Sequence, residues 1–129
     1  MSKKNIGFTC SSFDLLHAGH ILMLKDAKNQ CDYLIVGLHS NPQIERPNKN
    51  KPIQTLKERK IQLEAVKYID EILVYETETE LYEILKRINP DVRILGSDYM
   101  NKNFTGKDLH IPIYFHERNH DFSSSSLRK

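Results

Sequence analysis

Five short runs of apolar residues are spread along the chain, and segments with helical spacing separate several of them. Apolar runs that alternate with helices are typical of parallel strands whose two faces are both covered. The expected strands are residues 5–10, 32–39, 71–75, 92–95 and 112–115. This pattern predicts an α/β fold with an open parallel sheet and helices on both of its faces. The last run begins with proline, which lacks an N–H for pairing, so we expect it at an edge of the sheet.

Three segments have the apolar spacing of a helix. In the first, the apolar positions are Ile21, Leu22, Leu24 and Ala27. The second is expected to begin at Thr55, because Glu58 follows three residues later in the spacing of a capping box. The third, residues 79–88, stops before Asn89 and Pro90, since proline cannot continue a helix.

The size and charge of the chain restrict the classes of protein to which it could belong. With 129 residues, 39% of them hydrophobic, the chain is long enough for one core, and we expect a single domain over residues 1–129. Its 19 basic and 17 acidic residues nearly cancel, which argues against general binding to nucleic acid or to membranes. No apolar run approaches the length of a membrane span, and Cys10 and Cys31 are interpreted as free thiols in a reducing compartment. We therefore expect a cytoplasmic protein.

Two histidines mark the junction between the first strand and the first helix. His17 and His20 stand three residues apart within residues 13–20, so both are expected on one face of the first helical turn. The amino end of a helix attracts anions through its N–H groups and its dipole. Gly19, between the histidines, leaves room for close approach. The pattern predicts a phosphate site in which two imidazoles donate hydrogen bonds to one group.

Other roles for these histidines stay open at the level of the sequence. They could cap the helix or lie on the surface, or they could bind zinc together with Cys10, although no CxxC or second histidine pair completes a tetrahedral set.

Two further segments are ambiguous. The polar loop at 40–55, with Arg46, Lys49 and Lys51, is either solvated or a contact for a substrate phosphate. The serine-rich end of the chain is either a tail or the start of a helix.

Three blocks of sequence carry a resemblance to a known family. They are residues 13–20, residues 58–60 in the second helix, and Arg118 followed by residues 122–126. Residues 70–71 and 96–99 agree as well. The chain resembles the HxGH nucleotidyltransferases, and most closely the bacterial glycerol-3-phosphate cytidylyltransferases. The resemblance covers nearly the whole chain and implies a doubly wound, Rossmann-like parallel sheet of five strands in the order 3-2-1-4-5.

The resemblance implies a reaction in which a substrate phosphate oxygen attacks the α-phosphorus of a nucleoside triphosphate and pyrophosphate leaves. The catalytic residues would be His17, His20 and Arg118. The nucleotide-binding residues would be Ser11, Ser12, Phe13, Asp14, Gly19, Arg59, Gly96, Asp98, Tyr99, Ser123, Ser124 and Ser125. Arg46, Lys49 and Lys51 would contact the second substrate. Mg²⁺ would arrive with the triphosphate, with Asp14 as an indirect supporter and no separate metal site.

The resemblance favours CTP and a small phosphorylated alcohol, such as glycerol 3-phosphate, as substrates of a homodimer. Residues 46–52 are also similar to the heptose-phosphate adenylyltransferase branch, so ATP with a sugar phosphate or another phosphate acceptor is the alternative. At the positions of Ser11 and Ser12, members of the family often have glycine followed by threonine or cysteine. The larger side chain in place of glycine would narrow the phosphate-binding loop. A nucleotide-binding module without activity is the rival hypothesis from another class.

Overall fold

A parallel β-sheet forms the centre of the computed structural model, which describes residues 4–42 and 51–117. Its strands are β1 (Ile6–Ser11), β2 (Tyr33–His39), β3 (Glu71–Tyr75), β4 (Val92–Gly96) and β5 (Ile113–His116). All four neighbouring pairs are parallel, and the order across the sheet is β3-β2-β1-β4-β5. The predicted fold class and strand order are confirmed, with strand ends within one residue of those expected. The strand that Pro112 precedes is at an edge, as predicted.

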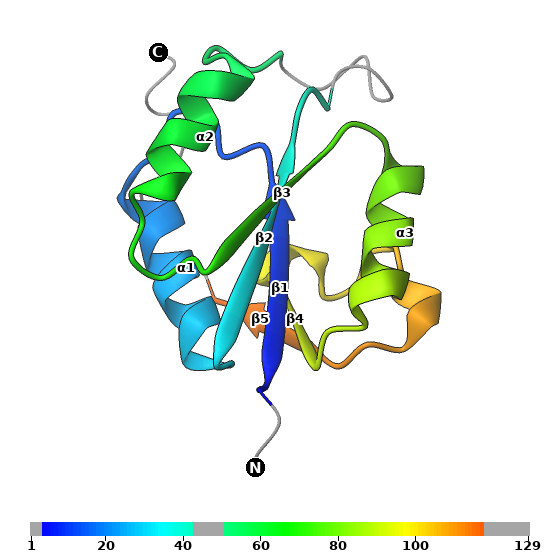
Figure 1. The fold of residues 1–129 in the computed structure, drawn as a ribbon. Coiled ribbons are helices and arrows are strands. Elements are labelled where there is room, and N and C mark those ends of the chain that lie inside the picture. Colours follow the sequence, from blue (N-terminus) through cyan, green and yellow to red (C-terminus); the bar gives the residue numbers. More distant parts are fainter. Residues whose placement is uncertain (1–3, 43–50, 118–129) are drawn as a thin grey trace.

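Three helices cover the two faces of this sheet (Figure 1). The helices α1 (Ala18–Asn29) and α2 (Leu56–Glu64) lie on one side, and α3 (Glu78–Ile88) lies on the other. Two short 3₁₀ turns, η1 (Ser97–Tyr99) and η2 (Lys107–Leu109), follow β4. No helix in residues 4–42 and 51–117 is long and apolar enough to cross a membrane.

Side chains at the helix ends explain where the helices begin and end. Thr55 caps α2 by accepting from the N–H of Glu58 at 3.1 Å, and the Glu58 carboxylate accepts from the N–H of Thr55 at 2.9 Å. This is the predicted capping box. Thr77 caps α3 in the same way. That helix ends at Asn89, whose left-handed φ of 47° turns the chain before Pro90, because asparagine tolerates this conformation.

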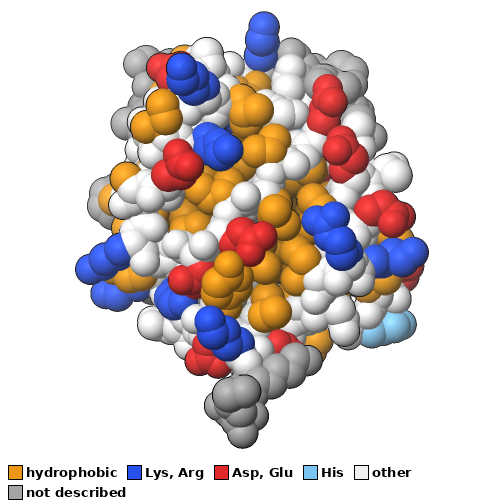
Figure 2. All heavy atoms as spheres, viewed as in Figure 1, with side chains coloured by type: hydrophobic (Ala, Val, Ile, Leu, Met, Phe, Trp, Pro, Cys, Tyr) orange, Lys and Arg blue, Asp and Glu red, His pale blue; other side chains and the backbone are white. Residues whose placement is uncertain are grey.

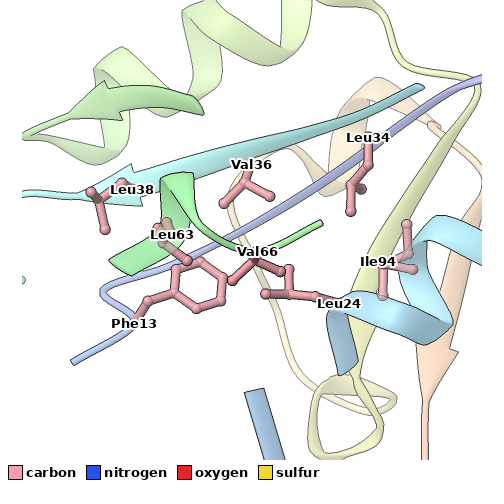
Figure 3. Close-up of a cluster of buried hydrophobic side chains, with 9 residues drawn as sticks. Phe13, Leu24, Leu34, Val36, Leu38, Leu63, Val66 and Ile94 are labelled. Atoms are coloured by element: carbon pink, nitrogen blue, oxygen red, sulfur yellow. The ribbon is translucent and has the colours of Figure 1, made fainter. Parts of the chain in front are cut away.

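The core has one layer on each face of the sheet, as the alternation of side chains along a strand requires. Figure 3 shows the layer beneath α1 and α2, where Leu34, Val36 and Leu38 of β2 meet Leu24 of α1. On the other face, Ile35 and Phe8 pack with side chains of α3. Since β2 contributes to both layers, it is buried along most of its length.

Polar side chains fasten the edges of the sheet to α1. At the β3 edge, Lys28 of α1 donates to the carboxylate of Asp70 at 2.6 Å, and the same carboxylate accepts from the N–H of Leu34 at 2.8 Å. At the β5 edge, Asp26 of α1 pairs with His116 at 2.8 Å and accepts from Tyr114 at 3.1 Å. Both cysteines, Cys10 and Cys31, are free thiols.

Candidate active site

The carboxyl ends of β1 and β4 meet at the point where the strand order reverses. From β1 the chain passes through α1 to β2 on one side, while β4 lies on the other side of β1. Phe8 pairs with Arg93, so continuing this register by three residues places Ser11 level with Gly96. Ligands of doubly wound sheets bind at this point. The residues after β1 and after β4 therefore share one edge of the sheet.

Two stacked imidazoles stand at the start of α1. The ring centroids of His17 and His20 are 4.0 Å apart, with an angle of 28° between the rings. His17 is the N-cap residue of the helix, and its Nδ1 accepts from the N–H of Gly19 at 2.9 Å. The Nδ1 of His20 accepts from the N–H of His17 at 3.3 Å. The two histidines thus form their own capping box, and the expected convergence of the rings is present.

These hydrogen bonds fix the tautomer of both histidines. Because Nδ1 accepts an N–H in each ring, the neutral imidazole carries its proton on Nε2. Both residues can then act as Nε2–H donors. The N–H of Gly19 donates to His17, while the expectation that Gly19 leaves room for a phosphate stays a prediction. The capping role and the phosphate role, which the sequence left as alternatives, are compatible, since they use different ring nitrogens.

The turn between β1 and α1 has an unusual backbone. Phe13 and Leu15 have φ values of 48° and 52°, in the left-handed region that costs a residue other than glycine about 1 kcal/mol. Phe13 is fully buried in the core layer of Figure 3, and its ring also meets the ring of His20 at 5.5 Å. The N–H of Leu15 donates to the side chain of Gln54 at 2.9 Å. Packing and this bond hold the turn that presents the histidines.

Asp14 ties this turn to the segment before α2. Its two carboxylate oxygens accept from the N–H groups of Ile53 and Gln54, both at 2.9 Å, and the residue is 3% exposed. The sequence predicted Asp14 as a nucleotide-binding residue and an indirect supporter of Mg²⁺. In the structure both of its carboxylate oxygens accept backbone N–H groups, so it positions one loop against another. Lys51, which is exposed, lies two residues before this attachment.

Arg59 on α2 is the buried cation of the site. It is 2% exposed, and its guanidinium donates to the carbonyl oxygens of Ser12 at 3.0 Å, His39 at 2.7 Å and Ser40 at 2.6 Å. Nε donates to the carbonyl of Gln54 at 3.2 Å. Burial lowers the pKa of the guanidinium, and the nearby charge of Asp14 opposes that shift. Arg59 therefore joins the ends of β1 and β2 to the start of α2, and its expected phosphate contact stays a prediction.

The remaining predicted residues divide into two groups. Ser11, Ser12, Gly96, Asp98 and Tyr99 lie at or directly after the ends of β1 and β4, on the same edge as the histidines. Ser11 accepts weakly from the N–H of Phe13 at 3.5 Å. Outside the described residues are Arg46, Lys49, Arg118, Ser123, Ser124 and Ser125.

His39 is a residue of this region to which the sequence assigned no role. Its ring stacks on Tyr75 with centroids 4.7 Å apart, and Nε2 contacts the carbonyl of Glu76 at 3.0 Å. Burial and the neighbouring Cys10 raise the pKa of Tyr75, so its phenol stays neutral. Only the position of His39 at a strand end hinted at this role. The side chain of His39 joins the ends of β2 and β3, and its backbone carbonyl oxygen accepts a hydrogen bond from Arg59.

A protein-bound metal does not fit the described part of the site. In residues 4–42 and 51–117, no group of three or more His, Cys, Asp or Glu side chains is placed to hold a metal ion. Both oxygens of Asp14 already accept backbone N–H groups. That Mg²⁺ arrives bound to the nucleotide stays a prediction.

Comparison with known proteins identifies the family of this chain. The sequence signature of cytidylyltransferase-like proteins matches residues 8–129. The chain belongs to the cytidylyltransferase-like family. It is therefore a member of the HxGH nucleotidyltransferases, as the histidine block and the Arg59 block indicated.

Curated relatives of this cytidylyltransferase-like chain are much longer than it is. It is 39% identical over 107 residues to the bifunctional protein HldE of Wolinella succinogenes, which is 82% of this chain and 22% of that protein. It is 34% identical over 128 residues to the bifunctional protein HldE of Helicobacter pylori, which is 98% of this chain and 28% of that protein. The chain thus spans about a quarter of the length of these relatives.

Solved structures support the fold of this cytidylyltransferase-like chain. A lipopolysaccharide core biosynthesis protein from Thermoplasma volcanium matches with a TM-score of 0.72 and 23% identity, over 92% of this chain and all of that one. A pantoate-beta-alanine ligase from Francisella tularensis matches with a TM-score of 0.69 and 22% identity, over 100% of this chain and 67% of that one. At these identities the likeness concerns the fold.

Proposed function

We propose that this chain transfers a nucleoside monophosphate from ATP to a sugar phosphate and releases pyrophosphate. The observation that carries the proposal is the stacked pair of His17 and His20 at the start of α1, in which the Nδ1 atom of each ring accepts a backbone N–H. The pair stands at the switch point of a doubly wound sheet in a nucleotidyltransferase family. This placement suits two donors that act on one phosphoryl group.

In the proposed reaction an oxygen of the acceptor phosphate attacks the α-phosphorus in line with the leaving group. The bond from the α-phosphorus to its bridging oxygen breaks, and pyrophosphate takes that electron pair. The Nε2–H groups of His17 and His20 donate to the oxygens on which negative charge grows. Such fixed donors stabilise the transition state more than the ground state. No group of the protein forms a covalent bond.

The rigid surroundings of the histidines support this role. Donors stabilise a transition state best when they need not reorganise, so their support matters as much as their chemistry. Arg59 and Asp14 form six hydrogen bonds with backbone groups, and three of these six hold the turn before α1 through Ser12 and Asp14. We propose that both are positioning residues, which hold the histidines and the loop that carries Lys51.

Two observations favour ATP and a sugar phosphate over CTP and glycerol 3-phosphate. Residues 46–52 resemble the heptose-phosphate adenylyltransferase branch. Five relatives that match over 81% to 98% of the chain all carry the name bifunctional protein HldE. We therefore prefer the alternative that the sequence left open, while the cytidylyl reading stays a prediction.

We also propose that the chain works as a homodimer. Figure 2 shows hydrophobic side chains gathered on the face of the molecule at which β3 forms the edge of the sheet. On that strand Val74 is 41% exposed, and on α2 Ile61 is 56% exposed. Analytical ultracentrifugation of the wild type and of Val74→Lys tests this proposal. A monomeric wild type contradicts it.

The decisive experiment measures pyrophosphate release with ATP and with CTP, each against a panel of sugar 1-phosphates, including heptose 1-phosphate, and glycerol 3-phosphate. We expect turnover with ATP and at least one sugar phosphate. Turnover with CTP and glycerol 3-phosphate alone would restore the cytidylyl reading. A nucleotide that raises the melting temperature without turnover on any acceptor would identify a binding module instead.

A further inference from the structure

The segment between β4 and β5 begins at the edge of the sheet that carries the histidines. Its first residues form η1, which includes Asp98 and Tyr99, two of the predicted nucleotide-binding residues. Residues 100–103 follow and are all exposed. The next residues that pack on the protein are 104–106, of which Gly106 is buried. The course of the exposed stretch therefore depends on what holds residues 104–106.

Arg93 of β4 holds these residues from the sheet. It is 2% exposed and lies level with Phe8, on the face that packs against α3. Its Nη1 donates to the carbonyl oxygen of Thr105, and its guanidinium carbon lies 5.2 Å from the ring centroid of Phe104. Nη1 is also 3.3 Å from the point where a side-chain carbon at Gly106 would begin. One guanidinium therefore lies close to three successive residues of the segment.

Two side chains of α3 hold the same segment from the helix. The carboxylate of Glu78 accepts from the hydroxyl of Thr105 at 2.8 Å, and the hydroxyl of Tyr82 donates to the carboxylate of Asp108 at 2.7 Å. Figure 1 shows η2, which contains Asp108, beside α3. Thr105 is thus bound at its carbonyl oxygen by the sheet and at its hydroxyl by the helix.

Stability alone does not favour an arginine at this place. A guanidinium in the interior loses its hydration, and Nε of Arg93 is buried without a hydrogen-bond acceptor in residues 4–42 and 51–117. An apolar side chain of similar length would fill the same space with a smaller loss of hydration. It could not donate to the carbonyl oxygen of Thr105 or lie as a cation over the ring of Phe104. What the arginine adds is therefore a defined place for residues 104–106.

We propose that Arg93 is a positioning residue for the nucleotide, and that it acts through the segment that begins with Asp98 and Tyr99. With Arg93 in place, the exposed stretch at 100–103 is short and held at both ends. Without this attachment the free part of the segment would extend past Thr105, and a longer loop has more conformations to lose when a nucleotide orders it. That loss of entropy would weaken binding.

This inference rests on the proposed function, because it takes η1 as part of the nucleotide site. Isothermal titration calorimetry with ATP, and with CTP in parallel, measures the nucleotide Kd of the wild type and of each variant. Arg93→Met should raise Kd about tenfold and change kcat at saturating nucleotide by less than about twofold, because the bound nucleotide orders the segment again. Arg93→Lys should recover part of the loss, since an ammonium can donate to Thr105 but lacks the planar face.

Three further variants separate positioning from general stability. Ile35→Val removes one methylene from the same core layer, on β2, and should lower stability while leaving Kd unchanged. Thr105→Val leaves the buried arginine intact, loses the hydrogen bond to Glu78 and should raise Kd about threefold. Thr79→Val makes the same chemical change at an exposed position of α3 and should not alter Kd. Amide hydrogen exchange at residues 97–106 should be faster in Arg93→Met and in Thr105→Val than in either control.

Three results would overturn the role of Arg93. The first is a nucleotide Kd that both Arg93→Met and Arg93→Lys leave unchanged. The second is an equal rise of Kd in Ile35→Val, which would reduce the effect to general stability. The third is an unchanged Kd in Thr105→Val, which decides the question should Arg93→Met not fold.

Failure of the proposed function gives a different result. A wild type that binds ATP or CTP but releases no pyrophosphate with any acceptor would contradict that function alone, because Kd and hydrogen exchange do not depend on turnover. A wild type that binds neither nucleotide would overturn both proposals.

Discussion

Nη1 of Arg59 donates to the carbonyl oxygen of His39 at 2.7 Å, and this bond joins the first turn of α2 to the last residue of β2. The same guanidinium donates to the carbonyl oxygens of Ser12, directly after β1, and Ser40, directly after β2. One buried side chain therefore holds three segments that meet at the proposed active site. The rigidity of the site depends on a residue that need not touch a substrate.

Replacing Arg59 by methionine should destabilise the fold and reduce turnover. Several buried carbonyl oxygens would lose their donors, and each such loss costs about 1–3 kcal/mol. Arg59→Lys should recover only part of the loss, because an ammonium cannot reproduce the planar fork. Urea unfolding and pyrophosphate release measure the two effects. Lys60→Met, at the exposed neighbouring position, is the control and should change neither.

A change of His17 to asparagine should separate capping from catalysis. Asparagine is among the best N-cap residues, so the free energy of unfolding should stay near that of the wild type. Turnover should fall about 100-fold or more, because the Nε2–H donor is lost. His17→Ala should lose the cap as well, at a cost of about 1 kcal/mol. Urea unfolding and pyrophosphate release, measured on both variants, test these expectations.

The control for this pair is His110→Asn. His110 is exposed and has a left-handed φ of 55°, which asparagine tolerates well. This variant should keep both its stability and its turnover. If His17→Asn retained wild-type turnover, the imidazole would have no role in the reaction and the proposed function would lose its central residue.

Asp14→Asn should weaken the link between the turn after β1 and the segment before α2. The carboxylate accepts from Ile53 and Gln54 through both oxygens, whereas an amide offers one acceptor and turns its NH₂ toward the second N–H. We expect KM for the acceptor substrate to rise more than kcat falls, because the displaced loop carries Lys51. Steady-state kinetics with the acceptor varied give this comparison.

Asp91→Asn provides the matched control for that variant. Asp91 also accepts a backbone N–H, that of Ile6 at 2.8 Å, but at the amino end of β1, far from the histidines. Its loss should lower stability by ~1 kcal/mol and leave KM unchanged. Equal changes of KM in both variants would mean that Asp14 acts only through general stability.

The sequence predicted the features that depend on neighbouring residues, but not the contacts between segments that are distant in the chain. The strands and the Thr55 cap follow from periodicity and from spacing within a few residues, so the sequence was sufficient to predict them. The convergence of His17 and His20 is also local, since both lie in one helical turn. Apart from the bond between Arg59 and Gln54, the hydrogen bonds of Asp14 and Arg59 join residues 19 to 47 positions apart, and no pattern in the chain predicts such pairing.

Burial of charge is the second feature that the sequence did not reveal. Arg59 and Arg93 both lie in segments with ordinary helix or strand patterns, and arginine is mostly exposed in proteins. Their burial follows from neighbours that fold against them, such as the carbonyl of His39 for Arg59 and the ring of Phe104 for Arg93. The sequence thus showed that these residues are polar, but only the fold shows which groups they contact.

The last prediction concerns the pH dependence of stability at the β3 edge. Desolvation of the Asp70 carboxyl would raise its pKa, but the hydrogen bond from Lys28, the N–H of Leu34 and the charge of Lys28 outweigh it, so the pKa is lowered. A carboxyl whose pKa is lower in the folded state stabilises the fold above its unfolded pKa of about 4. This contribution is lost as the pH falls through the folded pKa. Asp70→Asn should therefore be less stable than the wild type by ~1 kcal/mol at pH 7, and the difference should shrink below pH ~4.

Urea unfolding of the wild type, Asp70→Asn, Lys28→Gln and the double variant at neutral and acidic pH measures this contribution. The coupling between the two positions should be present at pH 7, since the ammonium and carboxylate are 2.6 Å apart. It should disappear once Asp70 is protonated, because the carboxyl then no longer carries the charge that Lys28 stabilises. A coupling that persists or grows under acidic conditions would contradict the assigned direction of the pKa shift, and would place the contribution of Asp70 in its hydrogen bond to Leu34 alone.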